Sequence, residues 1–369
     1  MIYMESDILN KVQTGLKNFN PDVYTNIDVE NTLLKESLDV DDFATLLSPA
    51  AEDFIEEMAY RSKIETSNQF GNSISLFTPL YISNHCENNC IYCGFNSQNK
   101  IQRGSLSFEE IEEELIAISK TGLQDILLLT GESKSTSLEY IADAVKLARE
   151  YFNLVGLEIY PIDVKNYEYL HFCGADYLCT YQETYNKDQY FKCHLNGPKS
   201  NYEYRFNSQE RAIKGGMRKV AFGALFGLGD FRADAFATGL HGHYIQRKYP
   251  KSEISFSFLR LRPFIHQDLK YGVEVSERQL LQLILAQRLF TPFADITIST
   301  REDSQFRNGV VGIGVNRLSA GVSVGVGGYA KDLKGDEQFE IQDTRSVKEI
   351  KNFLYKKGLQ PVFNNYVYL

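Results

Sequence analysis

The strongest constraint on the fold is a regular alternation of short β-rich runs and amphipathic helical stretches, which begins at residue 73. Because neighbouring parallel strands need a crossover connection, usually a helix, this alternation predicts a parallel sheet. Eight runs have the length and apolar content of a strand, and they cover residues 73–82, 125–130, 154–162, 177–182, 219–228, 253–261, 295–300 and 320–326. Eight strand–helix pairs favour an α/β fold with a closed (β/α)8 barrel of the TIM type, although the pattern leaves open a partial barrel of six pairs.

The segments on either side of this barrel are predicted to be helical. Residues 1–70 are polar and acidic with short apolar-periodic stretches, which predict an N-terminal helical extension. The barrel core then covers residues 71–335. A last helical pattern over residues 346–357 ends at Gly358, where a glycine cap belongs. Residues 336–369 are therefore expected to form a C-terminal helix and tail that pack on the barrel.

Charge and hydropathy limit the classes of function. The net charge of −9 argues against a nucleic-acid-binding surface, which normally shows a basic excess, and favours a small-molecule substrate. No stretch approaches the roughly eighteen uninterrupted apolar residues of a membrane helix. The first residues, MIYMESDILNKVQTG, lack the basic-then-apolar layout of a signal peptide. We therefore expect a cytoplasmic protein that does not contact membranes.

Three of the six cysteines lie close together, in the segment NHCENNCIYCGF. Cys86, Cys90 and Cys93 follow the first predicted strand, so their loop is expected at the carboxyl ends of the barrel strands, where active sites lie. In a reducing compartment such a cluster points to metal ligation or redox chemistry rather than to disulfides. Three thiolates can hold three irons of a [4Fe-4S] cluster and leave the fourth open to an external ligand. The alternatives are thiols that are close by chance, or a zinc site with His85, whose adjacency to Cys86 is unsuited to chelating one tetrahedral ion.

The cysteine loop resembles that of the radical S-adenosylmethionine (SAM) superfamily, in which SAM chelates the open iron through its amino and carboxylate groups. LYISNHCENNCIYCGF resembles the aromatic amino-acid lyase branch of that superfamily. Over about residues 70–330, further motifs resemble the tyrosine lyases of thiamine biosynthesis, the ThiH or 2-iminoacetate synthase family; they are LLLTGES, LEIYP, YQETY, GPKSNYEYRF, ERAIKGGMRKVAFGALFGLGD, RLRP and ISTRE. The resemblance implies a radical SAM barrel with a [4Fe-4S] cluster and SAM as cofactors.

The resemblance also implies which residues contact SAM. Thr130, Gly131 and Glu132 resemble the Gly-Gly-Glu element of the superfamily, with threonine in place of its first glycine. A small residue there lets the backbone approach SAM closely, and Glu132 is expected to brace the loop. Glu183 corresponds to a carboxylate that contacts the ribose or the methionine end of SAM. Arg205 corresponds to an arginine that pairs with the methionine carboxylate, for which its planar fork is suited.

A second set of residues is expected to hold the substrate. By resemblance, Arg301 at the end of the seventh predicted strand anchors the amino-acid carboxylate, with Ser299 and Ser319 as hydroxyl partners. Tyr81 before the cysteine loop is expected on the substrate side of the pocket, and Tyr92 inside the loop on the cofactor side, although either ring is equally able to serve packing alone.

Three further side chains follow predicted strands and are expected to face the same pocket. Glu158 and Tyr160 end the third strand and Gln182 ends the fourth, so they are predicted to read the polar end of the substrate or to line the cavity. The glycine-rich run GVVGIGVNRLSAGVSVGVGGY lacks the lysine and the strand–helix context of a nucleotide loop. We expect its glycines to let the backbone close the barrel around substrate and cofactor.

The reaction implied by the resemblance is cleavage of the Cα–Cβ bond of L-tyrosine to dehydroglycine (2-iminoacetate) and p-cresol, with SAM converted to 5′-deoxyadenosine and methionine. The implied partners are the thiazole synthase ThiG and a reduced flavodoxin or ferredoxin-type electron donor. Three alternatives stay open: a tryptophan lyase of the same branch, a hydrogenase-maturase-like tyrosine lyase, and a zinc-stabilised binding protein without catalysis. The maturase carries a second cysteine-ligated cluster, whereas no cysteine follows Cys193 here.

Overall fold

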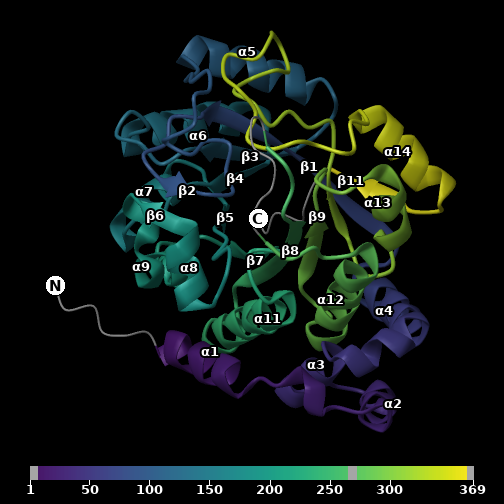
Figure 1. Ribbon diagram of the computed structural model, residues 1–369. Coiled ribbons are helices and arrows are strands. Elements are labelled where there is room, and N and C mark those ends of the chain that lie inside the picture. Colours follow the sequence, from purple (N-terminus) through teal and green to yellow (C-terminus); the bar gives the residue numbers. More distant parts are fainter. Residues whose placement is uncertain (1–6, 265–271, 364–369) are drawn as a thin grey trace.

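A computed structural model describes residues 7–264 and 272–363, and its centre is a closed parallel barrel (Figure 1). Eight strands follow one another around it in the order β1, β3, β4, β5, β7, β8, β9 and β10, and β10 pairs with β1 to complete the ring. The strands are β1 (Ser73–Ser83), β3 (Asp125–Thr130), β4 (Leu154–Glu158), β5 (Tyr177–Cys179), β7 (Lys219–Phe226), β8 (Glu253–Arg260), β9 (Asp295–Ile298) and β10 (Arg317–Ser319). The predicted (β/α)8 barrel is thus confirmed, and the six-pair alternative is wrong.

Helices cover the outside of the barrel, as Figure 1 shows. They are α5 (Phe108–Ser119), α6 (Leu138–Tyr151), α7 (Val164–Phe172), α10 (Ser208–Lys214), α11 (Phe231–Lys248), α12 (Glu277–Phe290), α13 (Ser304–Val310) and α14 (Val347–Lys356). Helix α5 illustrates how the sequence specifies them. The Ser107 hydroxyl accepts a hydrogen bond from the Glu110 amide and the Glu110 carboxylate accepts one from the Ser107 amide, which forms a capping box. Ile111 and Leu115 bury the inner face of this helix against the sheet.

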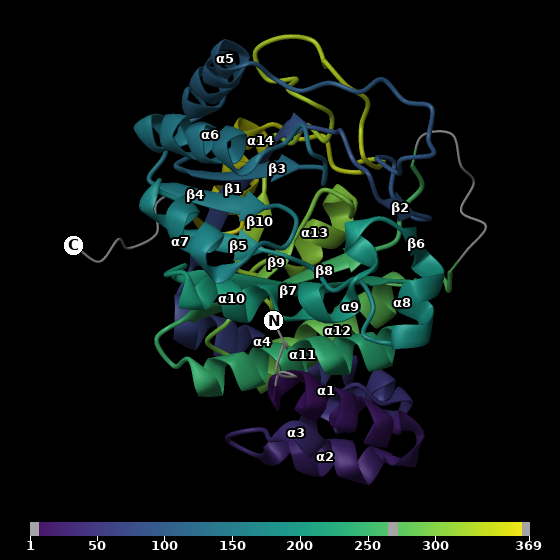
Figure 2. The ribbon, with the colours of Figure 1, turned by 90° about the vertical axis from the view of Figure 1, so that its left-hand side faces the viewer.

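The N-terminal helices lie together on one side of the barrel (Figure 2). They are α1 (Asp7–Asn18), α2 (Asn26–Leu34), α3 (Val40–Leu46) and α4 (Ile55–Phe70), with the 3-10 turns η1 (Pro21–Val23) and η2 (Pro49–Phe54) between them. Helix α1 packs on α11, and α3 and α4 pack on α12. The Phe43 ring stacks on Phe290 with 4.4 Å between ring centroids, so this layer is joined to the barrel helices by aromatic packing. Among the described helices, none is long and apolar enough to cross a membrane.

The predicted position of the eighth strand, residues 320–326, is wrong. The strand that closes the barrel is β10, which ends at Ser319. Gly321 has a φ of +61° and turns the chain away from the sheet immediately afterwards. Residues 320–326 therefore contribute only isolated bridges, both at Val326, one with Tyr81 of β1 and one with Gly335. Val324 and Val326 are buried, and their alternation with polar residues imitates a strand although they pack over the end of the barrel.

The connection from β5 to β7 is longer than the single crossover helix that the alternation predicts. It contains α8 (Lys187–Cys193), β6 (His194–Asn196), η3 (Pro198–Ser200), α9 (Tyr202–Phe206) and α10. Strand β6 pairs antiparallel with β2 (Asn89–Cys90), which lies inside the cysteine loop. A further short strand, β11 (Gln360–Val362), pairs with the start of β1. The β2–β6 pair attaches the cysteine loop to a segment about a hundred residues further along the chain.

Candidate active site

Two adjoining cavities lie at the carboxyl ends of the barrel strands. The first, here called the cysteine cavity, is lined by Cys86, Cys90 and Cys93 together with Thr130, Gly131, Glu132 and Arg205. The second, here called the arginine cavity, is lined by Arg301, Ser299, Ser319 and Tyr92, among others. Several residues line both cavities; they are Tyr81, Cys93, Leu129, Glu158, Tyr181, Glu183, Lys199 and Gln338. The two groups of predicted site residues are therefore brought together in one continuous space.

Side-chain amides and one guanidinium hold the backbone of the cysteine loop. Asn96 donates from its side-chain nitrogen to the Cys90 carbonyl at 2.9 Å, and Asn99 donates to the Cys93 carbonyl at 3.2 Å. The Arg103 guanidinium donates to three loop carbonyls, those of Asn84, Phe95 and Asn96. Because these bonds do not use the sulfur atoms, the polar residues of the loop hold its backbone in place and leave the thiols available to a ligand.

The three thiols fit an iron–sulfur cluster by their chemistry and their position. Burial raises the pKa of Cys90 to about 12 and also raises the pKa of Cys93, so these thiols keep their protons unless a cation replaces them. His85 lines neither cavity. Within the described residues, no three His, Cys, Asp or Glu side chains are arranged to hold a single metal ion.

The residues after β3 pack against the cysteine loop. A Cβ atom on Gly131 would lie 2.3 Å from the His85 carbonyl oxygen, so the glycine is required by the close approach of this loop. Glu132 accepts a hydrogen bond from the Asn88 side chain at 2.7 Å, and its carbonyl accepts one from the Glu87 amide at 2.8 Å. Glu132 therefore holds the cysteine loop against the end of β3, which forms one wall of the cysteine cavity.

Glu183 lies between two cations at the junction of the cavities. Its Oε1 atom accepts a hydrogen bond from Lys199 Nζ at 2.7 Å and lies 3.5 Å from Arg205. Burial opposes ionisation of this carboxyl, but the charges of Lys199 and Arg205 outweigh burial and lower the pKa of Glu183. Its backbone has a φ of +72°, the one positive value outside glycine among the described residues, which is a strained conformation of the kind concentrated at functional sites.

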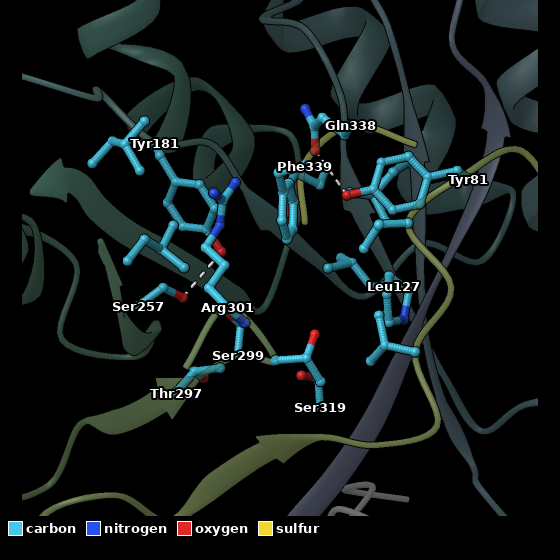
Figure 3. A pocket seen from close by; sticks show the side chains of 18 of the residues that line it. Tyr81, Leu127, Tyr181, Ser257, Thr297, Ser299, Arg301, Ser319, Gln338 and Phe339 are labelled. Atoms are coloured by element: carbon cyan, nitrogen blue, oxygen red, sulfur yellow. Dashed lines mark hydrogen bonds between the residues drawn. The ribbon is translucent and has the colours of Figure 1, made fainter. Parts of the chain in front are cut away.

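Arg301 dominates the arginine cavity. Its guanidinium carbon lies 3.4 Å from the centre of the Phe339 ring, and Figure 3 shows the two side chains in the cavity. Ser319 ends β10 in the same cavity, and its buried hydroxyl has no hydrogen-bond partner among the described residues. A buried hydroxyl without a partner is costly, so Ser319 is a ready ligand-binding group.

The segment that follows the barrel core covers the site. Gln338 accepts a hydrogen bond from the Tyr81 hydroxyl at 2.8 Å and donates to Cys93 Sγ at 3.5 Å, so it joins the two predicted groups (Figure 3). Phe339, from the same segment, contacts Arg301. These two residues were missed in the sequence, which carries no local motif for them. Lys199 was missed as well, although it lies in GPKSNYEYRF, one of the motifs that carry the resemblance.

The remaining predicted residues differ in position. Tyr92 donates to or accepts from His194 Nε2 at 2.7 Å and lines the arginine cavity rather than the cysteine cavity. Tyr160 lines the cysteine cavity, and its hydroxyl donates to the Thr136 carbonyl. The expectation that Gln182 lines the pocket is wrong, because Gln182 lines neither cavity and its side chain packs inward toward α9.

Glu158, the last residue of β4, lines both cavities. Burial and the nearby charge of Glu183 raise its pKa to about 7, while Arg301, Lys199 and Arg205 oppose the shift. Perturbed carboxyls of this kind cluster at functional sites.

Comparison with known proteins gives concordant results along the chain. Residues 80–237 match the model of the Radical SAM superfamily, and residues 257–360 match that of the Biotin and Thiamin Synthesis associated domain. The chain is 38% identical over 348 residues to the 2-iminoacetate synthase of Salmonella typhimurium and 37% identical over 348 residues to that of Escherichia coli, in each case covering 93% of this chain and 91% of the relative. The X-ray structure of the FeFe-hydrogenase maturase HydG from Carboxydothermus hydrogenoformans superposes with a TM-score of 0.89 at 29% identity, covering 98% of this chain and 86% of the other.

Proposed function

We propose that this chain, which belongs to the radical SAM superfamily and within it to the family of the 2-iminoacetate synthases, cleaves the Cα–Cβ bond of L-tyrosine to dehydroglycine and p-cresol. Members of this superfamily use a [4Fe-4S] cluster and SAM. When bound, the two together supply the radical that removes a hydrogen atom from the substrate, and SAM is converted to 5′-deoxyadenosine and methionine. The observation that carries the proposal is the continuity of a cavity lined by three thiols with one that contains an arginine able to anchor an amino acid.

The cysteine cavity is the proposed cofactor site. Cys86, Cys90 and Cys93 would hold three irons of the cluster, and the remaining iron would be free to bind the amino and carboxylate groups of SAM. Arg205 donates from Nε to the Tyr181 carbonyl at 2.7 Å, which orients its guanidinium toward Glu183 and supports its assignment to the methionine carboxylate. Glu183, ionised by its cations, is suited to accept hydrogen bonds from the ribose of SAM.

The arginine cavity is the proposed substrate site. Arg301 binds the carboxylate of tyrosine, with Ser299 and Ser319 as hydroxyl partners. Tyr81 lines both cavities, and the hydrogen bond from its hydroxyl to Gln338 fixes its ring where the two cavities meet. The Phe339 ring packs on the Arg301 guanidinium and limits the access of water to the cavity. Exclusion of water helps a radical reaction to avoid side reactions.

The biological setting follows from the same family assignment. The product feeds assembly of the thiamine thiazole, and we propose ThiG as the protein partner and a reduced flavodoxin or ferredoxin-type protein as the electron donor. We place the enzyme in the cytoplasm. We also propose the division into a helical extension (residues 1–70), a barrel core (71–335) and a C-terminal helix and tail (336–369), and the contacts of Gln338 and Phe339 support a functional role for the last part.

The test is an anaerobic assay of the reconstituted chain with L-tyrosine, SAM and a reductant. We expect p-cresol and 5′-deoxyadenosine to form together, and no cresol without SAM. A parallel assay with L-tryptophan distinguishes the other branch of the family. Cleavage of tryptophan without cleavage of tyrosine, or a reconstituted protein that binds no iron, would contradict the proposal.

A further inference from the structure

Two opposite charges face each other across the end of the barrel. Glu158 ends β4 and Arg301 follows β9, and in the closed ring these strands are four positions apart, which places them on opposite sides. Both side chains line the arginine cavity, and each contributes to the electrostatic environment of the other. Across the part of the chain that the structure describes, however, neither forms an ion pair or a side-chain hydrogen bond, so the space between them is bounded by one negative and one positive group.

The neighbouring charges explain why these two stay separate. Glu302, next to Arg301 in sequence, is fully buried and already binds Arg260 and Arg262. On the other side, Glu183 binds Lys199 and Arg205. Among the described residues, these neighbouring charges are thus paired within the protein and are not available to Glu158 or Arg301. Leaving two half-buried charges unpaired at the wall of a cavity is unfavourable, and a ligand that supplies both complementary charges offsets that cost.

A free α-amino acid is such a ligand, because it carries an ammonium and a carboxylate on adjacent atoms. We propose that Glu158 accepts hydrogen bonds from the ammonium of the amino-acid substrate while Arg301 binds its carboxylate. This inference rests on the proposed function and names the group that recognises the second polar end of the substrate. Because Glu158 lines both cavities, the assignment places the substrate nitrogen at the boundary with the cysteine cavity, next to the proposed cofactor site.

The proposal makes Glu158 a specificity residue as well. An amino acid and its analogue without the amino group differ by one ammonium. A site whose carboxylate has no internal partner binds that ammonium and therefore discriminates against the analogue. Arginine recognition alone does not, because both molecules have the carboxylate. The competing assignment is that Glu158 binds a polar group of SAM, such as the ribose, because Glu158 also lines the proposed cofactor cavity.

The experiment measures binding rather than turnover. Isothermal titration calorimetry under anaerobic conditions, on the cluster-loaded, SAM-bound protein without reductant, gives the Kd of L-tyrosine and of 3-(4-hydroxyphenyl)propanoate, its analogue without the amino group. We expect the wild type to prefer tyrosine by about 10- to 100-fold, which is the size of a hydrogen bond to a charged group. Glu158→Gln keeps the side-chain shape, and its preference should fall to within about threefold of unity while the Kd of SAM stays unchanged. Glu168→Gln, the same change on the exposed side of the following helix, is the matched control and should keep the full preference.

The outcomes separate this inference from the proposed function. Retention of the tyrosine preference in Glu158→Gln overturns the inference. If SAM binding weakens in the same variant, Glu158 serves the cofactor instead. If the wild type itself binds tyrosine no better than the analogue and produces no p-cresol, the proposed function is at fault. Should Glu158→Gln lose its cluster, Glu158→Asp tests the same point, because its shorter carboxylate keeps the charge and should restore part of the preference.

Discussion

The two ends of the barrel differ in whether the polar side chains inside it have partners within the protein. At the amino ends of the strands, Arg317 lies 2.8 Å from Asp125 and donates to the Tyr177 hydroxyl, which in turn donates to Asp125. Lys219 pairs there with Asp295. At the carboxyl ends, Glu158, Arg301 and the Ser319 hydroxyl make no such bonds among the described residues. The charges at the amino end are therefore paired within the protein and serve stability, and we call this the satisfied end. Some polar groups at the carboxyl end have no internal partner and serve binding, and we call this the incomplete end.

The largest expected effect is at the incomplete end. Replacing Cys86, Cys90 or Cys93 with alanine should abolish both 5′-deoxyadenosine and p-cresol, because two thiolates leave the cluster without its third anchor. Free Cys173, which lies on the outer side of the barrel after α7, is the matched control, and Cys173→Ala should keep both activities. Iron content and the electron paramagnetic resonance spectrum of the reduced protein check the cause. Persistent SAM cleavage in all three variants would contradict the ligand assignment.

At the satisfied end the expected effect is on stability. Arg317→Met leaves Asp125 as a buried charge without its partner, and we expect the free energy of unfolding to fall by about 3–5 kcal/mol. The double variant with Asp125→Leu removes both charges and should regain much of that loss. Denaturant unfolding of the cluster-free proteins measures both. Glu158→Gln provides the comparison, because removing a charge that has no internal partner should cause no loss of stability. Equal destabilisation of the single and the double variant would show that the ion pair is not the source.

Arg301→Ala should separate substrate binding from cofactor chemistry. Loss of the carboxylate anchor is expected to weaken tyrosine binding by about 1.5–3 kcal/mol, or about 10- to 100-fold in Kd. SAM cleavage in the absence of tyrosine should change little, because Arg301 does not line the cysteine cavity. Titration with tyrosine and the rate of uncoupled 5′-deoxyadenosine formation measure the two effects. A parallel fall in both, at normal tyrosine affinity, would rule out the anchor role.

The fold is the part that the sequence predicts best. Strand β3 is predicted with both its ends, and the last helix ends before Gly358, whose φ of +76° fits the predicted glycine cap. These signals are local, because periodicity and capping depend on neighbouring residues. The eighth strand was misplaced because Gly321 ends the pairing within a run whose alternation continues past it.

The incomplete end was predicted less fully, for a physical reason. Cys86, Arg301 and Glu183 were found because they lie in short motifs at strand ends. Gln338 and Phe339 reach the same cavity from a segment that follows the barrel core, and their role depends on long-range packing that no spacing encodes. The sequence also does not predict that Glu158 lacks an internal partner, because this depends on how the neighbouring charges pair with one another in the fold.

The smallest effect expected is a pH dependence that arises from Glu158. Its pKa is about 7 because of burial and the charge of Glu183, against the opposing charges of Arg301, Lys199 and Arg205. Tyr81, Cys179 and Tyr181 also face it. The carboxylate needed for the ammonium is thus present above pH 7 and lost below it. Between pH 8 and pH 6 the Kd of tyrosine should therefore rise by about tenfold.

The amino group of free tyrosine stays protonated throughout that range, so the change reports the protein. The analogue without an amino group should bind with a Kd that changes less than about twofold over the same interval, because Arg301 keeps its charge, and Glu158→Gln should make the tyrosine profile equally flat. A profile that keeps its slope in Glu158→Gln would assign the titration to another group. The titrating charge of the incomplete end would then belong to a residue other than Glu158.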